Sequence, residues 1–180
     1  MTFTGSLLHI HRCAQAGAPM QPLEAAVLDA GVGIRGDRYA LRTGTYSQRH
    51  HVDRQVTLIE AETLDALQRD RAIALDPSEH RRNLTTRDVA LGHLVGRYFR
   101  VGSCVLYGGR LNVPCTYLQD LLDKPVFRPL LNRSGLNARV VVGGTIARGD
   151  LIRPVDRAEL PASLVAANEL TPVEPAPEVF

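Results

Sequence analysis

Apolar and polar residues alternate along several short stretches of this chain, which is the pattern of half-buried β-strands. Glycine-rich turns separate the stretches, and only a few segments, such as residues 62–67, have the apolar spacing of a helix. The expected strands span residues 5–11, 23–28, 54–60, 92–102, 103–109, 138–142 and 146–155. The last two are predicted to form a hairpin around Gly143–Gly144. The pattern therefore predicts a mainly β fold, a β-barrel or closed sheet with two or three short helices.

The first strand carries two histidines on one face. Leu8 and Ile10 are expected to face the core, with His9 and His11 on the opposite side. Two histidines that share a face could bind a metal, but no third ligand is nearby in the sequence. The solvated side of a half-buried strand is therefore the favoured interpretation.

Length and composition indicate one globular domain followed by a tail. The 180 residues are 44% hydrophobic and 22% charged, which is ordinary for a folded domain. We expect the domain to span residues 1–155. Residues 156–180, rich in Pro, Ala and Glu, are expected to form a C-terminal tail that is mobile or lies on the surface. The net charge of +2 is too small to predict nucleic-acid binding.

The cysteines and the N-terminal residues indicate a cellular compartment. The three cysteines are odd in number and show no C-x-x-C spacing, so no disulfide framework is expected. The N-terminal residues lack the apolar core of a signal peptide, and no apolar run is long enough to span a membrane. A reduced, cytoplasmic setting with no membrane partner is the prediction.

A glycine-rich stretch, Gly31–Gly36, matches the dinucleotide fingerprint G-x-G-x-x-G. That motif requires a helix to begin there, and the following residues show no helical stripe. We therefore reject a Rossmann fold and expect a tight loop that presents Asp37 and Arg38. The polar residues 43–53 are predicted to be an exposed loop, with His50 and His51 facing solvent.

Arginine, amide and hydroxyl side chains cluster in the segment Arg81–Arg87. Such a group suits an oxyanion or a ligand rich in heteroatoms, since arginine can make bidentate contacts to phosphate. A solvated loop that turns into a strand explains the same residues equally well, and the sequence leaves both interpretations open.

Cys115 lies where a strand, a turn and a short helix are expected to follow one another, in residues 110–122. Pro114 suits a first helical position, and Leu118, Leu121 and Leu122 form an apolar stripe. Cys115 would then lie in the first helical turn, where the positive end of the helix favours the nucleophilic thiolate form. The alternative is an inert, buried cysteine.

Taken together, these motifs resemble a MOSC domain, named after the C-terminal domain of molybdenum-cofactor sulfurase. They follow the family's order over roughly residues 5–155. The matching segments are Gly33–Tyr39, Arg54–Ile59, Arg82–Thr86, Pro114–Cys115 with Leu118, and Ala138–Val140 through Gly143–Gly144 to Gly149–Asp150. The chain looks like a stand-alone, single-domain member.

The resemblance implies a β-barrel-like fold that binds the molybdenum cofactor, or molybdopterin. It makes Cys115 the catalytic residue and the molybdenum ligand, or the residue that carries sulfur. The residues implied to contact the cofactor or shape its mouth are Arg82, Asn83, Thr85, Thr86, Asp37, Arg38, Arg54 and Asn112. Pyridoxal phosphate is not expected, because it needs a Schiff-base lysine and Lys124 is the only lysine.

Two departures from the family's pattern affect what can be transferred. Arg110 lies four residues before Pro114, whereas an Arg-x-Pro-Cys form is common in the family. Residues 1–180 show no match to the N-terminal extension of the amidoxime-reducing members, so we do not expect their substrate range to transfer.

Three functions remain open. The first is a molybdenum-dependent oxidoreductase that reduces N-hydroxylated small molecules, with electrons from a partner redox protein. The second is a sulfur or cofactor carrier, with a Cys115 persulfide supplied by a cysteine desulfurase. The third is a β domain with an inert cysteine and a surface for a small ligand or a partner. The sequence identifies no general acid or base.

Overall fold

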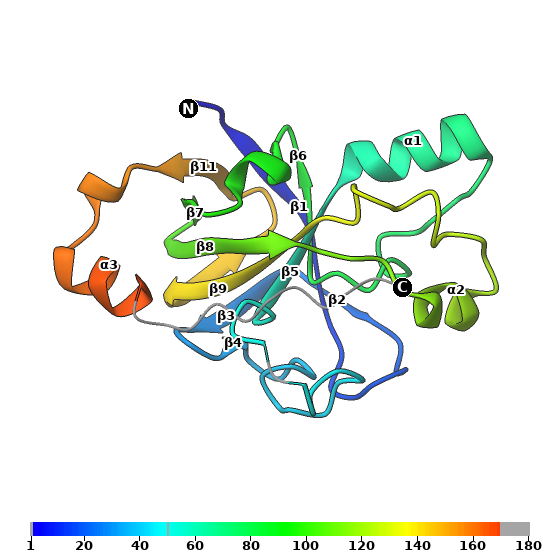
Figure 1. The fold of residues 1–180 in the computed structure, drawn as a ribbon, viewed down its shortest axis with the longest axis horizontal. Helices are drawn as coiled ribbons and strands as arrows, with labels where there is room; N and C mark the ends of the chain where they lie inside the picture. Colours follow the sequence, from blue (N-terminus) through cyan, green and yellow to red (C-terminus); the bar gives the residue numbers. More distant parts are fainter. Residues whose placement is uncertain (1, 50, 170–180) are drawn as a thin grey trace.

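The computed structural model describes residues 2–49 and 51–169. Figure 1 shows a central group of strands, with helices α1 and α2 on one side and α3 on the other. The elements in chain order are β1 (Gly5–Arg12), β2 (Gln21–Leu23), β3 (Ala25–Asp29), β4 (Gly33–Ile34), β5 (Val56–Glu60), α1 (Ala61–Arg71), β6 (Leu84–Arg87), the 3-10 helix η1 (Leu91–Leu94), β7 (Tyr98–Val101), β8 (Cys104–Leu111), α2 (Thr116–Leu122), β9 (Leu136–Val142), β10 (Gly144–Ala147), β11 (Leu151–Val155), the 3-10 helix η2 (Arg157–Glu159) and α3 (Ala162–Glu169).

Seven strands close into a barrel, in the order β11-β7-β8-β9-β5-β6-β1, and β11 pairs again with β1. Strand β2 extends the sheet beyond β1, and a separate three-stranded sheet has the order β10-β3-β4. The barrel interior holds an apolar core whose larger members include Phe99, Leu7, Ile10, Leu58 and Leu106. The predicted fold class, a mainly β barrel with a few short helices, is confirmed.

Strands β5 and β6 pair in parallel. Among the described residues, all other neighbouring strands of the barrel pair antiparallel. Parallel neighbours need a crossover connection, and α1 provides it. The inner face of α1 buries Leu64 and Leu67 in a second apolar core outside the barrel, together with Ile59 and Leu118. This second core carries α2 and therefore positions the segment around Cys115.

A bulge in β1 changes the predicted alternation of that strand. The pairing of β1 with β6 shifts register between Leu7 and His9. Leu7 and Ile10 consequently point into the barrel, while Leu8 is only half-buried and lies outside it. The prediction that Leu8 and Ile10 share the core face was wrong, because one extra residue in the strand reverses the side-chain order beyond it.

The hairpin predicted around Gly143–Gly144 does not form. Strand β9 pairs with β5 and β8, whereas β10 pairs with β3 in the small sheet. The chain changes sheet at this point, and a Cβ at Gly143 would lie 2.6 Å from the Leu28 carbonyl oxygen. Glycine is needed here for the close approach of two backbones rather than for a hairpin turn. The strand expected at residues 92–102 is also shorter, because η1 occupies its start.

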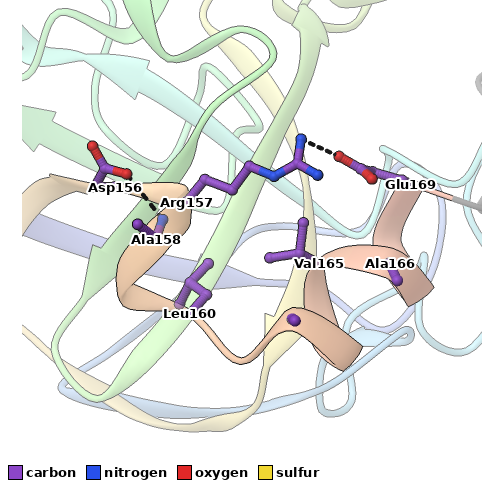
Figure 2. Close-up of a pocket in the computed structure, with 8 residues that line it drawn as sticks. Asp156, Arg157, Ala158, Leu160, Val165, Ala166 and Glu169 are labelled. Atoms are coloured by element: carbon purple, nitrogen blue, oxygen red, sulfur yellow. Dashed lines mark hydrogen bonds and ion pairs between the residues drawn. The ribbon is translucent and has the colours of Figure 1, made fainter.

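Residues 156–169, expected as the start of a tail, form η2 and α3. Val165 of α3 packs on Tyr98 and Val155 at the barrel surface. A hollow of about 510 Å³ lies between η2 and α3. Figure 2 shows Arg157 reaching across it to Glu169. The domain boundary at residue 155 stays a prediction, and residues 170–180 lie outside the described part of the chain. No helix in residues 2–49 and 51–169 has the length and apolar character to cross a membrane.

A substitution at Gly135, just before β9, tests the packing of this strand on β5. A Cβ at Gly135 would lie 1.8 Å from the Leu58 carbonyl oxygen, and its φ of +97° disfavours other residues. We expect Gly135→Ala to lower the free energy of unfolding by about 3 kcal/mol or more, measured by urea denaturation. The control Gly149→Ala has a similar φ of +87° but open space around it, so it should cost only about 1 kcal/mol. Equal losses in the two variants would contradict this description of the close approach.

Candidate functional site

Cys115 lies at the N-cap of α2, between the end of β8 and the first helical residue. Its backbone is extended, with φ −135° and ψ 152°, and its side chain is half-buried against the second core. The predictions that Pro114 occupies the first helical position and Cys115 the first turn were therefore wrong. The predicted apolar stripe is incomplete, because Leu118 is buried while Leu121 is 40% exposed.

The Tyr46 phenol lies close enough to the Cys115 thiol for the two groups to interact electrostatically. Burial, together with this contact, raises the pKa of Tyr46 above its ordinary value, so the phenol keeps its proton at neutral pH. Tyr46 comes from the loop 43–53, which therefore folds back over the start of α2. A protonated hydroxyl beside the sulfur is a hydrogen-bond donor for a thiolate or for a ligand held there.

Arg82 places a buried positive charge near the same sulfur. Its guanidinium donates to the carbonyl oxygens of His80 and Ser134 and to the Ser134 hydroxyl. Burial lowers the pKa of Arg82 to about 10, and the nearby Cys115 opposes that shift. Arg82 is thus still charged at neutral pH, and no carboxylate forms an ion pair with it in the part of the chain that the structure describes. An uncompensated buried cation favours an anion beside it.

Asn112 belongs to the polar network that holds Arg82. Its side-chain oxygen accepts from the Ser134 hydroxyl at 3.3 Å, and its amide lies 2.6 Å from the Asn137 amide. Ser134 therefore connects Asn112 to the guanidinium of Arg82. The predicted residues Arg82, Asn112 and Cys115 lie in one region.

A second buried network includes His51, which was predicted to face solvent. That prediction was wrong, because His51 is only 5% exposed. Its Nε2 accepts from Arg110 at 3.2 Å, and its Nδ1 lies 3.7 Å from the Asp53 carboxylate. Asp53 is fully buried and accepts from Arg139 at 2.7 Å. Arg110, whose place in the family's pattern was in doubt, is thus tied to His51. His50 lies outside the described residues.

Asp37 and Arg38 are buried rather than presented by the glycine loop. They contact each other at 3.2 Å, and Arg38 also donates to the sulfur of Cys13 and to the Arg81 carbonyl oxygen. Burial raises the pKa of Asp37, although Arg38 acts in the opposite direction. The pair therefore anchors the loop to the barrel, and Asn83 donates to the same Asp37 carboxylate.

Arg54 supports the loop that carries Tyr46. Its guanidinium donates to the carbonyl oxygens of Tyr46 and Arg49 and lies over the Tyr46 ring, 5.4 Å from the centroid. It also lies 5.8 Å from the centre of the Tyr39 ring. Arg54 thereby fixes the position of Tyr46, which lies near Cys115. Among the described residues, no hydrogen bond connects Arg54 to the Cys115 sulfur.

Thr85 and Thr86 lie further from this centre. Thr85 shares a hydrogen bond with His80, and Thr86 donates to the Ile59 carbonyl oxygen. No hydrogen bond connects either residue to Cys115 within residues 2–49 and 51–169. The cofactor-binding roles assigned to all of these residues stay predictions.

The MOSC domain model matches residues 45–153, more than half of the chain. The chain belongs to the MOSC domain family. The region around Cys115, Arg82 and Tyr46 lies within the matched segment, whereas Asp37 and Arg38 precede it. A search of curated proteins finds no match.

Solved structures share this MOSC fold at low sequence identity. The YuaD protein of Bacillus subtilis has a TM-score of 0.73 at 17% identity, over 86% of this chain and 97% of its own. YiiM from Geobacillus stearothermophilus has a TM-score of 0.63 at 15% identity, over 85% of this chain and 76% of its own. YiiM from Escherichia coli has a TM-score of 0.62 at 16% identity, over 84% of this chain and 70% of its own. These likenesses establish the fold.

Sequence reasoning missed several residues of the candidate site. Tyr46 and His51 come from a polar segment that was predicted to be exposed. Ser134 lies in the connector between α2 and β9, for which the sequence predicted no role. No periodicity marks these residues, since each is brought to the site by long-range packing. The nearest signal was the absence of apolar spacing in residues 43–53, which shows only that the segment is not a regular element.

His80, which lies beside Arg82, gives the stability of the folded protein a testable pH dependence. Its ring is fully buried, and burial followed by the Arg82 charge lowers its pKa well below the usual value of 6.5. The unfolded chain therefore binds more protons than the folded chain below pH 6.5, so the stability provided by a neutral His80 is lost as the pH falls. We expect the free energy of unfolding to decline below pH 6.5, with His80 adding up to about 1.4 kcal/mol per pH unit.

Urea denaturation between pH 7 and pH 5 measures this slope. His80→Asn keeps an acceptor for the Arg82 backbone N–H and should give a shallower slope. His93 is exposed, so His93→Asn should give the same slope as the native protein. An unchanged slope in His80→Asn would show that this residue is not the source.

Proposed function

We propose that this MOSC protein binds the molybdenum cofactor at Cys115 and reduces N-hydroxylated small molecules. The observation that carries the proposal is the buried Arg82 guanidinium, which has only neutral hydrogen-bond acceptors and lies near the half-buried Cys115 thiol. A soft sulfur ligand and an uncompensated cation suit a metal that enters with an anionic organic group.

The donor set fits this cofactor better than a metal ion bound by protein alone. No group of three or more His, Cys, Asp or Glu side chains is placed to hold a metal in residues 2–49 and 51–169. Cys115 would supply the protein's ligand to molybdenum, and Arg82 would compensate the negative charge of the pterin's phosphate. Asn112, through Ser134, would hold the guanidinium in place.

The overall reaction that we propose converts a hydroxylamine, R–NHOH, with two electrons and two protons into R–NH2 and water. The bound cofactor would supply the two-electron chemistry, with electrons from a partner redox protein. Tyr46 would hold its proton beside the sulfur, since burial raises its pKa. The loop 43–53 would limit water access to the thiol, because Arg54 holds the loop by two carbonyl oxygens.

A carrier function is the second candidate, and the partial exposure of Cys115 favours it. A thiol at the surface of the second core can be reached by a partner, and a cysteine desulfurase could transfer a sulfane sulfur to it. Cys13 and Cys104 are buried, so within the described residues Cys115 is the accessible thiol. In this function the cofactor or the sulfur would be delivered to another enzyme, without turnover by this chain.

Metal and pterin analysis of the purified protein distinguishes these functions. The native protein, produced in cells that make the cofactor, should contain molybdenum and pterin, and Cys115→Ala should lose most of the molybdenum. Cys104→Ala removes a thiol from the barrel core and should keep the metal if it folds. Circular dichroism would confirm that each variant retains the β fold.

The opposite result would redirect the assignment. If the native protein contains neither metal nor pterin, the oxidoreductase proposal fails, and mass spectrometry after exposure to a cysteine desulfurase becomes decisive. A sulfur adduct of Cys115 would support the carrier function. The absence of both results would leave an inert cysteine as the remaining explanation.

A further inference from the structure

A groove of about 480 Å³ lies on the outside of the barrel, away from the bonds that hold Cys115. It lies between α1, the connector of residues 74–79 and the strands β1 and β6, which Figure 1 shows below and beside α1. Its volume falls within the range of small-molecule sites. Cys115, Tyr46 and Arg82 do not line it, so it is separate from the site proposed above.

Thr85 lines this groove and has a buried hydroxyl with a proton to donate. The direction of that proton follows from His80. The Nδ1 of His80 accepts from the Arg82 backbone N–H at 2.9 Å, so the neutral ring carries its proton on Nε2. Nε2 lies 2.9 Å from the Thr85 oxygen and donates to it. Thr85 is 1% exposed, and its own O–H has no acceptor among residues 2–49 and 51–169. A buried donor without an acceptor is costly, which favours a ligand or a water molecule at this point.

Apolar side chains form part of the groove wall, and both cations at its rim are paired with carboxylates. Leu8, Leu64 and Leu75 are the larger apolar residues that line the groove together with Thr85. At the rim, Arg87 contacts Asp65 at 2.7 Å and Lys124 contacts Glu79 at 2.6 Å.

Both rim cations are therefore neutralised, and Asp76 adds a third carboxylate to the lining. An anionic ligand would meet more negative than positive charge here. The His9 ring also lines the groove, and burial, aided by Arg148 and opposed by Asp76, lowers its pKa. His9 therefore presents a neutral aromatic ring at neutral pH, rather than a cation.

We propose that this groove binds a small, neutral heteroaromatic molecule. A ring nitrogen or carbonyl oxygen of the ligand accepts from the Thr85 O–H, the ring lies against Leu8 and Leu64, and His9 contacts its face. Three requirements follow from the groove: one acceptor for the single buried donor, an apolar body for the walls, and no negative charge because of the rim.

Nicotinamide and nicotinate form a matched pair of probes, since they share one ring and differ in charge. Titration of the full-length, ¹⁵N-labelled protein with nicotinamide should shift amide resonances of residues 61–68, 74–79 and 85–87. Nicotinate, at the same millimolar concentrations, should shift them at least tenfold less. Shifts around residues 115–118 instead, or equal responses to both probes, would overturn the proposal.

Two variants test the contacts directly. Thr85→Val removes the hydroxyl but keeps the side-chain shape, and it should weaken nicotinamide binding roughly tenfold. Thr86→Val is the control, because the neighbouring hydroxyl donates to Ile59 and does not line the groove.

Ala74→Phe fills the groove from an exposed position and leaves the buried Thr85–His80 pair intact. It should abolish binding even if Thr85→Val folds poorly. Unchanged nicotinamide binding in Ala74→Phe, or no binding by the native protein, would show that the groove does not hold this class of ligand. Because the titration uses no cofactor and no Cys115 chemistry, its outcome is independent of the function proposed above.

Discussion

The barrel depends on the hydrogen bonds of one buried amide at its parallel seam. The Asn83 side-chain oxygen accepts from both the backbone N–H and the hydroxyl of Thr57 on β5, at 3.1 and 2.8 Å. Its amide nitrogen donates to the His11 carbonyl oxygen on β1 and to Asp37. One side chain, just before β6, thereby joins the two strands β5 and β1 to Asp37 at the end of the glycine loop. A buried amide with all of these partners stabilises one register, because any shift would leave several polar groups unpaired.

The hydrogen bonds of Asn83 also fix the position of the preceding residue, Arg82. With Asn83 held against β1 and β5, the Arg82 side chain lies on the side of the second core, near Cys115. The second core positions α2 and hence the thiol, while Ser134 and His80 position the guanidinium. The candidate site therefore lies where the barrel meets a separate apolar layer, and neither layer contains it alone.

Burying Arg82 with neutral partners costs stability, since a charge transferred from water needs compensation. Arg38 beside Asp37, and Arg139 beside Asp53, show that this chain pairs its other buried arginines with carboxylates. The exception at Arg82 lies near the half-buried Cys115 thiol. Unfavourable local features such as a buried cation without a carboxylate concentrate at functional positions, where a ligand supplies the missing partner.

The sequence by itself determined the mainly β fold, most strand positions and Cys115 as the residue of interest, because alternation and turn residues act locally. It also placed Arg82 and Asn83 in one informative cluster. Only the tertiary structure decided that Asn83 joins strands while Arg82 faces Cys115, and that Tyr46 reaches the thiol. It also decided that Gly143 marks a change of sheet and that a bulge turns Leu8 outward. These outcomes depend on contacts between distant segments, which no local pattern encodes.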